Sequence, residues 1–465
     1  MRDAGLERGF VVLVVVVAAA LAGVTIAPAV GGAVATPSPA TDAAVDHPDD
    51  DAFDPVTESG VATVGDERFQ SVQAAVDAAE TGDTVRLRGR FDERVVVNTT
   101  GVTVTTAPDA RAVIDGGQEG DVLTIEAANV SVRGVWIRNS GMDTSTNDAG
   151  IWVDAPNATV ADSRLTEITF GVWVDGVDDA TLRNNTIVGR EDVSPRSYRG
   201  NGIQLWKTEG TLVENNRITD ARDGIYYSWA SDVTARGNTL WDLRYGVHYM
   251  YSDSCRLVNN TAADNDVGYA LMLSEELSVV NNTAVNNTGT SGHGILLKRI
   301  DYSTIRGNEF VGNQRGIYSL NSAENEIVDN LVLGNRIGFH LTAGTHGERV
   351  VGNSFVGNRR HVQAVTSETH VWNDSGRGNY WSGAGAADLD DDGVSELRYR
   401  PAGLVEKLVR ENPAAAVFTN SPAFEALRRA ERTLPIVDAP GVVDYHPLER
   451  SPHDWRDHYA RDRDD

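Results

Sequence analysis

The sequence predicts an all-β protein, a right-handed parallel β-helix in which coils of about 22 residues stack into a rod. Two repeated features predict this fold. A glycine that opens an alternating apolar stretch recurs along the middle of the chain, and most steps between these glycines are 22 residues. An Asn-rich turn recurs with it. A fixed period in the twenties is typical of stacked units, none of which can bury its apolar face alone.

The repeating unit is a strand rather than a helix. Segments 150–153 and 224–227 alternate with a period of two and are rich in β-branched and aromatic residues. Asn suits the turns because it tolerates a left-handed backbone, and stacked Asn side chains can bond one another. The glycines are Gly150, Gly171, Gly202, Gly224, Gly246, Gly268, Gly294, Gly316 and Gly338. The turns contain Asn184-Asn185, Asn215-Asn216, Gly237-Asn238, Asn259-Asn260, Asn281-Asn282, Gly307-Asn308, Asp329-Asn330 and Gly352-Asn353.

The coils are predicted over residues 61–371, with a helical cap at their N-terminal end. The apolar residues of 69–79 have helical spacing, and a short helix there would cover the unpaired backbone groups of the first coil. A strand pattern follows at 82–87.

A small mixed cap is predicted over 372–450, with an acidic loop followed by two helices near 402–410 and 422–433. Ser421 is the expected N-cap of the second helix, with proline at its first position. The acidic segment 451–465 is expected to be a disordered tail.

Residues 1–35 are predicted to be a signal peptide or an N-terminal membrane anchor. Basic residues precede an apolar run over 10–29, and a small-residue cleavage pattern follows at 33–35. The run is also about long enough to remain as a single membrane anchor, so both alternatives stay open. Either one implies export. Residues 36–60 are rich in Pro, Asp and Ala and are expected to form a disordered acidic linker.

The charge balance excludes one class of partner. The chain has 41 Lys and Arg against 67 Asp and Glu, a formal net charge of −26. The phosphates of nucleic acid would repel such a surface. The excess of carboxylates is typical of halophilic acidic proteins, which stay soluble in concentrated salt. Cys255 is the single cysteine, so an internal disulfide and a thiolate-rich metal site are excluded, and we expect it to be buried.

Three coils carry insertions at the same phase of the repeat, within segments 137–150, 185–202 and 282–294. All three should therefore project from one corner of the rod. Insertions that gather on one edge of a solenoid often mark a working face.

The outward positions of the glycine-led strands are too apolar for a face open to water. We therefore expect a partner, a substrate or the chain's own terminal segments to cover this face. The candidate partner-binding residues are Trp152, Trp173, Trp206 and Tyr226.

Within that face, His248, Met250 and Met272 are neighbours on adjacent coils, which lie about 4.8 Å apart. Thioether and imidazole ligands suit cuprous copper, so the three residues form a candidate copper site. The alternative is that the methionines fill a contact surface.

The acidic loop is a candidate calcium site. Asp388, Asp390 and Asp392 precede a glycine, as at the start of a calcium-binding loop, and Glu396 stands at the ninth position. Tyr399 occupies the twelfth position in place of a bidentate Glu, which rules out a complete EF-hand. The role expected for calcium is structural.

Two other functions fit a β-helix. One is an enzyme that cleaves or epimerises an acidic polysaccharide, and the other is a cell-surface carbohydrate-binding solenoid. Such an enzyme would need carboxylates or histidines grouped within two or three coils, since the catalytic groups must flank one bond within about 10 Å. The sequence reveals no such group, so catalysis is not expected.

The C-terminal segment carries the most specific signal. The sequences at 378–382, 388–393, 399–401, 421–435 and 443–448 resemble the end of the NosD family of nitrous oxide reductase maturation proteins. The resemblance runs from about residue 61 to 448. The coils alone are weaker support, because many β-helical proteins share them.

The resemblance implies an exported β-helix without catalysis of its own, on the extracytoplasmic side of the membrane, in the periplasm or its archaeal equivalent. Its implied role lies in denitrification, in assembling the copper centres of nitrous oxide reductase. The implied partners are the permease and ATPase of an ABC transporter, and nitrous oxide reductase or a copper chaperone. Membrane association would come through a partner or through the N-terminal segment. The family offers no strict metal motif to carry over.

Overall fold

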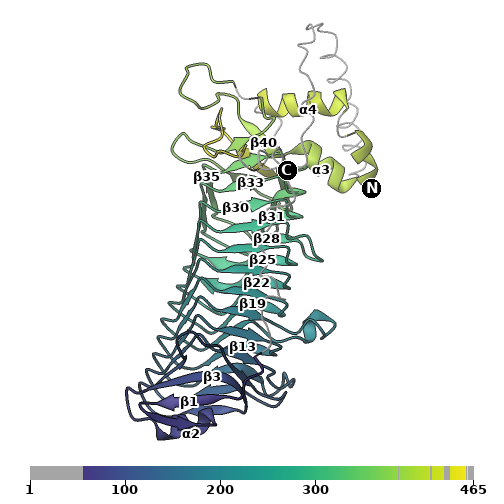
Figure 1. The fold of residues 1–465 in the computed structure, drawn as a ribbon. Helices are drawn as coiled ribbons and strands as arrows, with labels where there is room; N and C mark the ends of the chain where they lie inside the picture. The colour runs from purple at the N-terminus through teal and green to yellow at the C-terminus, as the bar shows by residue number, and fades with distance from the viewer. Residues whose placement is uncertain (1–55, 386, 419–420, 434–439, 457, 459–465) are drawn as a thin grey trace.

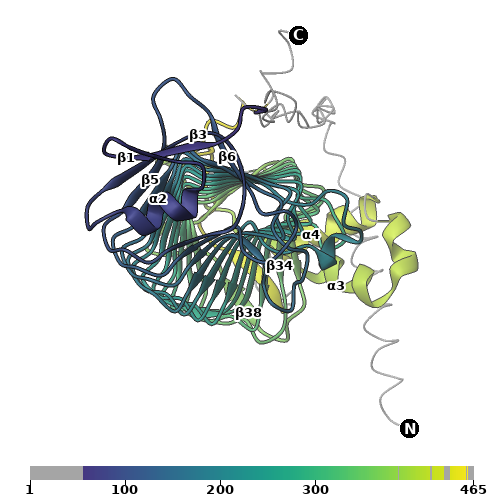
Figure 2. The same cartoon turned by 60° about the horizontal axis from the view of Figure 1, so that its bottom comes forward.

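The computed structural model describes residues 56–385, 387–418, 421–433, 440–456 and 458. It confirms the predicted fold class. Coils stack into a rod that runs from helix α2 (Val72–Ala78) at one end to helices α3 (Leu404–Glu411) and α4 (Pro422–Thr433) at the other (Figure 1). Seen obliquely from the N-terminal end, successive coils lie one behind another (Figure 2).

Each coil contributes one short strand to each of three sheets, here named A, B and C. Their strands run parallel except at the N-terminal end of sheet B, where the first strands pair antiparallel. Sheet C contains β4 (Val95–Val97), β7 (Leu123–Ile125), β10 (Ala149–Val153), β13 (Phe170–Asp175), β16 (Ile203–Trp206), β19 (Asp223–Ser228), β22 (Tyr245–Met250), β25 (Val267–Glu275), β28 (His293–Asp301), β31 (Arg315–Leu320), β34 (Ile337–Leu341) and β37 (Val362–Ala364).

Sheets A and B share strand β3 (Thr84–Asp92) at the N-terminal end. Sheet A continues with β6 (Ala112–Asp115), β9 (Trp136–Arg138), β12 (Arg164–Thr166), β15 (Thr186–Val188), β18 (Arg217–Thr219), β21 (Thr239–Trp241), β24 (Thr261–Ala263), β27 (Thr283–Val285), β30 (Glu309–Val311), β33 (Leu331–Leu333), β36 (Ser354–Val356) and β39 (Tyr380–Trp381). Sheet B contains β1 (Val61–Val64), β2 (Glu67–Phe69), β5 (Thr103–Thr106), β8 (Ser131–Arg133), β11 (Thr159–Ala161), β14 (Thr181–Arg183), β17 (Leu212–Glu214), β20 (Thr234–Arg236), β23 (Arg256–Val258), β26 (Ser278–Val280), β29 (Thr304–Arg306), β32 (Glu326–Val328) and β35 (Arg349–Val351).

The core lies inside the coils. In β22 the inward residues Val247 and Tyr249 are fully buried, and in β25 they stack in register on Tyr269 and Leu271. Each fully buried side chain of this size contributes about 1.5–3 kcal/mol from the removal of apolar surface from water. Cys255 is also buried, as predicted, and burial raises the pKa of its thiol to about 12.

The glycines and the asparagines recur from coil to coil for separate physical reasons. A Cβ on Gly246 would stand 2.6 Å from the carbonyl oxygen of Gly268 in the next coil, so no larger residue fits there. The Asn column forms the predicted ladder. In it the backbone N and the Nδ2 of Asn260 both donate to Asn282 Oδ1 at 2.9 Å, and Asn282 donates in turn to Asn308. The ladder therefore satisfies the backbone and side-chain hydrogen-bonding groups of the buried turns, each turn bonding to the next.

The N-terminal cap is the predicted helix, α2. Ser71 is its N-cap, and its Oγ accepts a hydrogen bond from Ala74 N at 3.1 Å. Glu93 Oε1 also accepts from Val72 N at 2.6 Å, which ties the helix to the first coil.

The C-terminal cap closes the other end with aromatic rings and a three-stranded sheet of β38 (Thr369–Val371), β41 (Gly441–Asp444) and β40 (Tyr399–Ala402). Trp381 stacks on Phe355, the inward aromatic residue of β36, with ring centroids 4.3 Å apart. Asp444 Oδ2 accepts from Trp381 Nε1 and from Asn379 N, both at 2.8 Å. A 3-10 helix, η2 (Pro413–Phe418), separates α3 from α4, and Ser421 Oγ accepts from Phe424 N as expected for an N-cap.

The segment 451–465 was expected to be disordered, and for its described part this prediction is wrong. His453 Nδ1 lies 2.7 Å from Ser354 Oγ, and its Nε2 lies 2.8 Å from the carbonyl oxygen of Asp329. Trp455 packs against outward apolar residues of sheet A. The segment packs despite its acidic composition, because it also contains the aromatic ring of Trp455 and the hydrogen-bonding side chains of Ser451 and His453.

The predicted signal peptide or anchor, 1–35, and residues 36–55 of the predicted linker lie outside the described residues. Among the helices that the structure describes, none is both long enough and apolar enough to cross a membrane.

Candidate functional site

Three long loops stand along one edge of sheet C, as their common phase predicted. They comprise residues 139–148, 189–202 and 286–292, and each connects a sheet A strand to the following sheet C strand. The second contains the 3-10 helix η1 (Arg196–Tyr198). Arg199 fixes this loop, because its guanidinium donates to the carbonyl oxygens of Val193, Asp220 and Glu191, each at 2.9 Å.

The outward face of sheet C next to these loops carries the four aromatic residues predicted to bind a partner. Trp152 and Trp173 stack face to face, with ring centroids 5.2 Å apart and an interplanar angle of 3°. Trp173 is only 9% exposed, and Trp206 and Tyr226 are partly buried. The face is apolar as predicted, but its own side chains and the loops close much of it.

Asp223 and His248 form the centre of this face. Asp223 is fully buried, and its Oδ2 lies 3.0 Å from His248 Nδ1 and 2.6 Å from a terminal nitrogen of Arg244. Burial alone would raise the pKa of Asp223, but the hydrogen bonds from His248 and Arg244 outweigh burial and hold that pKa below its usual value. The carboxylate thereby fixes the orientation of the imidazole.

His248 Nε2 is the unusual atom of the site. It is buried and has no hydrogen-bond partner within the described residues. Tyr226 and Tyr245 pack against the ring, with centroids 4.5 and 5.0 Å away. A histidine held by a carboxylate at one nitrogen, with the other nitrogen bare, is the arrangement usual for metal-ligating histidines.

The structure places Met250 and Met272 on the same face as His248. Met250 follows His248 by two positions on β22 and lies in register with Met272 on β25, and the residue in register with His248 is the small Ala270. Met272 also packs with Leu296, so contact filling accounts for part of its role. One imidazole nitrogen and two thioethers fit cuprous copper, whose preferred ligands are soft.

The structure corrects one expectation from the sequence. Asp223, Arg244 and His248 do form a group of titratable side chains within two adjacent coils, although the sequence revealed none. Asp223 comes just before the repeated Gly224, at the position where later coils carry Tyr245, Val267 or Ile337. That departure from the apolar pattern was the signal available.

His293 and His340 also have a buried Nδ1 without a hydrogen-bond partner in the described part of the chain, but their rings are not adjacent. Tyr318 lies between the two rings, with centroids 4.7 and 4.9 Å from them. Burial lowers the pKa of His293 to about 3 and that of His340 to about 4, so both side chains are neutral at physiological pH.

Two exposed aromatic residues were missed by the sequence analysis. Trp229 and Tyr251 follow β19 and β22, are 56% and 43% exposed, and stack with ring centroids 4.6 Å apart. Both have a left-handed backbone, with φ of 57° and 55°, where bulky residues are rare. They stand at the edge of the face that carries Met250.

The acidic loop brings three of its four predicted ligands together. One carboxylate oxygen from each of Asp388, Asp390 and Asp392 lies within 4.8 Å of the others. Repulsion from Asp392, with smaller effects from burial and Glu396, raises the pKa of Asp390. Glu396 is not part of this group, and its Oε2 instead accepts from Leu389 N at 2.9 Å.

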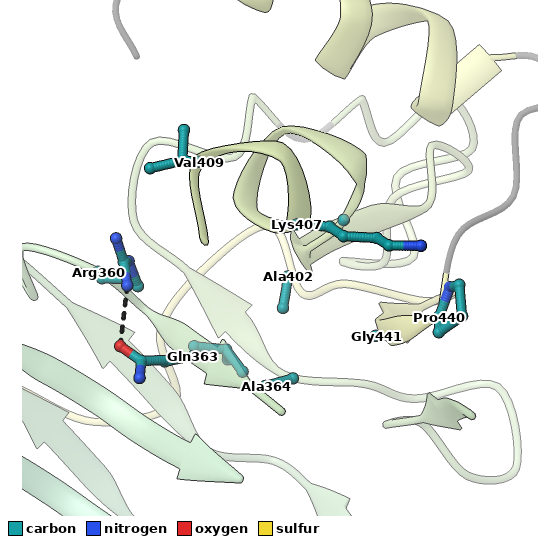
Figure 3. A pocket seen from close by; sticks show the side chains of 10 residues that line it. Arg360, Gln363, Ala364, Ala402, Lys407, Val409, Pro440 and Gly441 are labelled. Atoms are coloured by element: carbon teal, nitrogen blue, oxygen red, sulfur yellow. Dashed lines mark hydrogen bonds between the residues drawn. The ribbon is translucent and has the colours of Figure 1, made fainter. Parts of the chain in front are cut away.

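A small cavity of about 190 Å³ lies between the last coil and the C-terminal cap (Figure 3). Arg360 and Lys407 line it, and Arg360 donates to Gln363 Oε1 at 2.8 Å. Gln363 Nε2 lies 3.1 Å from His340 Nε2. The cavity therefore belongs to the packing of cap against coil.

Comparisons with known proteins show the family of this chain. The family described as periplasmic copper-binding protein (NosD) matches residues 189–385, and a family of unknown function, DUF1565, matches residues 82–268. Two relatives are named probable ABC transporter binding protein NosD. The protein from Pseudomonas aeruginosa is 41% identical over 360 residues, covering 74% of this chain and 83% of the relative. That from Stutzerimonas stutzeri is 39% identical over 359 residues, covering 73% and 81%.

Among solved structures, the A-module of the Azotobacter vinelandii mannuronan C-5 epimerase AlgE6 is similar in fold. The TM-score is 0.51 at 16% sequence identity, covering 63% of this chain and 91% of that module. The chain is thus a parallel β-helix protein whose outward face carries a buried, carboxylate-held histidine beside paired methionines. It belongs to the NosD family.

Proposed function

We propose that this chain is an exported, non-catalytic copper-binding scaffold that works with an ABC transporter in maturing the copper centres of nitrous oxide reductase. Copper is its cargo, bound by His248 Nε2 and by the thioethers of Met250 and Met272. The names of the family and of its two relatives support the copper and transporter parts of this role. The same family description supports an extracytoplasmic location.

The single observation that carries the copper proposal is the bare, buried Nε2 of His248. A buried nitrogen without a partner costs about 1–3 kcal/mol, and this cost is removed when a ligand occupies the position. In the tautomer that donates from Nδ1 to Asp223, Nε2 presents its lone pair to the site. Cuprous copper fits the neighbouring side chains best, because the two thioethers can bind it together with Nε2.

Partner docking is proposed for the outward face of sheet C around this site. The exposed pair Trp229 and Tyr251 would provide the rim that a copper donor or acceptor contacts. The four aromatic residues predicted to bind a partner, Trp152, Trp173, Trp206 and Tyr226, lie further along the same face towards the N-terminal end. Aromatic residues dominate the energetics of such contacts.

A catalytic role is less well supported, despite the grouping of Asp223, Arg244 and His248. A general base must come within hydrogen-bond distance of the proton that it removes. The bare nitrogen of His248 is buried, with Tyr226 and Tyr245 against the ring, so a polysaccharide could not reach it without a rearrangement.

The test is cuprous copper binding by the purified chain, measured anaerobically in competition with a chromophoric chelator. Replacing His248 by Gln should weaken affinity at least tenfold, the usual effect of losing a well-oriented metal ligand or its support. The double variant Met250→Leu, Met272→Leu keeps apolar volume and should also weaken binding. Met142→Leu, at an exposed methionine outside the face, is the matched control.

The proposal fails if the His248 and methionine variants bind copper as tightly as the unchanged chain. A second measurement tests the wider role. A strain that lacks this gene should accumulate nitrous oxide reductase without its copper, and the unchanged gene but not the His248→Gln gene should restore metallation.

A further inference from the structure

A second cavity lies at the loop-walled end of sheet C. It shares Trp173, Trp206 and Tyr226 with the proposed docking face but contains none of the proposed copper ligands. It has a volume of about 380 Å³ and opens between strands β13, β16 and β19 and the first two long loops. The residues that matter for its chemistry are Trp173, Tyr198, Gln204, Trp206, Arg222 and Tyr226.

The charge of the lining is opposite to that of the chain. The chain has 67 acidic residues among 465, yet no Asp or Glu lines this cavity, whereas Arg199 and Arg222 do. Arg199 is engaged in holding its loop. Arg222 uses only Nε, 3.1 Å from Asn201 Oδ1 and 3.9 Å from Asp223 Oδ2, so its two terminal nitrogens have no partner within the described residues. The cavity therefore offers a positive, donor-rich wall.

A buried amide network aims a second donor into the cavity. Asn201 is fully buried; its Oδ1 accepts from Arg222, and its Nδ2 donates to Gln204 Oε1 at 2.7 Å. Gln204 is 2% exposed, and because its oxygen is occupied, its Nε2 is the group left to bind a ligand. No partner for Gln204 Nε2 is found in the described part of the chain. Asn201 thus orients both donor groups, the guanidinium of Arg222 and the side-chain amide of Gln204.

The remaining walls are flat and apolar with polar edges. Trp173, Trp206 and Tyr226 come from successive strands, and Tyr198, 68% exposed, stands on the loop opposite. Lys207 Nζ lies 5.3 Å from the ring centroid of Trp206 and adds positive charge at the rim. Aromatic faces bordered by amide and hydroxyl groups bind rings that are apolar on one side and polar at the edge.

We propose that this cavity binds a carboxylate-bearing sugar unit, such as a uronate residue of an acidic polysaccharide. The carboxylate would lie against the terminal nitrogens of Arg222 and Gln204 Nε2, in charge-assisted hydrogen bonds. The sugar ring would lie among Trp173, Trp206 and Tyr198, and its hydroxyls would meet the polar edges. This is a binding site and not a catalytic one, and it does not depend on copper.

The experiment is titration of the full chain with trigalacturonate, followed by calorimetry and by the fluorescence of the cavity tryptophans. The neutral trisaccharide maltotriose is the comparison ligand. The acidic ligand should bind at least tenfold more tightly, and Arg222→Gln should remove most of this preference, because it keeps the hydrogen-bonding shape while deleting the charge. Tyr198→Ala, at an exposed loop position that poses little risk to folding, should weaken both ligands several-fold by removing ring contact.

Arg256→Gln is the matched control, since Arg256 is an exposed arginine on sheet B away from the cavity. It should leave both affinities unchanged. Equal binding of the two saccharides, or no binding of either, overturns the proposal. So does tight, Arg222-dependent binding of a glutamate-rich peptide without saccharide binding, which would assign the cavity to a protein partner instead.

Discussion

Asp223 Oδ2 lies 3.0 Å from His248 Nδ1, and the same carboxylate receives two hydrogen bonds from Arg244, at 2.8 and 2.6 Å. This shared carboxylate links the stability of two adjacent coils to the orientation of the candidate copper ligand. The link can be broken by one isosteric change.

Asp223→Asn should destabilise the chain by about 2–4 kcal/mol, because it leaves Arg244 and His248 facing a neutral amide in a buried site. It should also weaken cuprous copper binding by about 10–100-fold, since the imidazole is no longer held. Urea unfolding and the chelator competition measure the two effects. Asp242→Asn is the control, because Asp242 has a left-handed backbone that Asn tolerates equally well, and neither quantity should change.

The Asn ladder gives a second prediction. Asn282→Ala removes a fully buried amide that accepts from Asn260 and donates to Asn308. The loss should be about 3 kcal/mol or more in the free energy of unfolding, because several buried groups lose their partners at once. The neighbouring Asn281→Gly should cost only a few tenths of a kcal/mol, since Gly stands at the same turn position in other coils. Comparable losses in the two variants would contradict the ladder as a source of stability.

The buried carboxyl group of Glu348 should make the free energy of unfolding depend on pH. Burial raises the pKa of this carboxyl to about 7, and hydrogen bonds from Asn325 and Ser319 only partly oppose it. Because the folded pKa is raised, the favourable contribution of the protonated form is complete below the unfolded pKa of 4.5 and is lost as pH rises through about 7.

Glu348→Gln should therefore become stabilising relative to the unchanged chain as pH rises, by up to about 3 kcal/mol above pH 7. Urea unfolding at pH 4.5, 6 and 8 measures this difference. The exposed Glu324→Gln, in the same turn of the preceding coil, is the control and should follow the unchanged chain at every pH. A constant difference between Glu348→Gln and the unchanged chain would show that Glu348 does not titrate near neutrality.

The acidic loop predicts calcium binding. Calcium should raise the melting temperature, and at 100 times its dissociation constant the stabilisation is about 2.7 kcal/mol. Asp390→Asn should abolish the shift by removing one of the three converging carboxylates. Glu396→Gln should reduce it little, because that side chain bonds Leu389 N instead. Magnesium giving the same shift as calcium would argue for general charge screening.

Much of the fold could be predicted because it rests on local chemistry repeated in every coil. Gly246 recurs where the next carbonyl leaves no space, and Asn282 recurs where the next turn needs an acceptor. The packing of the C-terminal segment could not be predicted, since Ser451 lies 97 residues from its partner Ser354 and belongs to no repeated pattern.

The candidate site was predicted only in part. Strand alternation placed His248, Met250 and Met272 on one face, which the register confirms. It could not place Asp223, whose side chain reaches the next coil from the position before the glycine, where alternation gives no direction. Nor could it show that the turn residues Trp229 and Tyr251 adopt a left-handed backbone and stack in solvent.

The ladder of amides has a direction. Each ladder asparagine donates its backbone proton to the side chain of the following coil, from Asn185 up to Asn353 and Asn379, where Asp444 receives the last one. The Nδ2 group instead bridges both neighbours, because it also donates to a carbonyl oxygen of the preceding coil. As the chain emerges from its N-terminus during synthesis or export, the backbone N–H of each buried turn has no acceptor until the next coil has formed. The ladder is therefore completed only at its C-terminal end. A protein cut short before Asp444 would leave the backbone N–H of Asn379 without its acceptor.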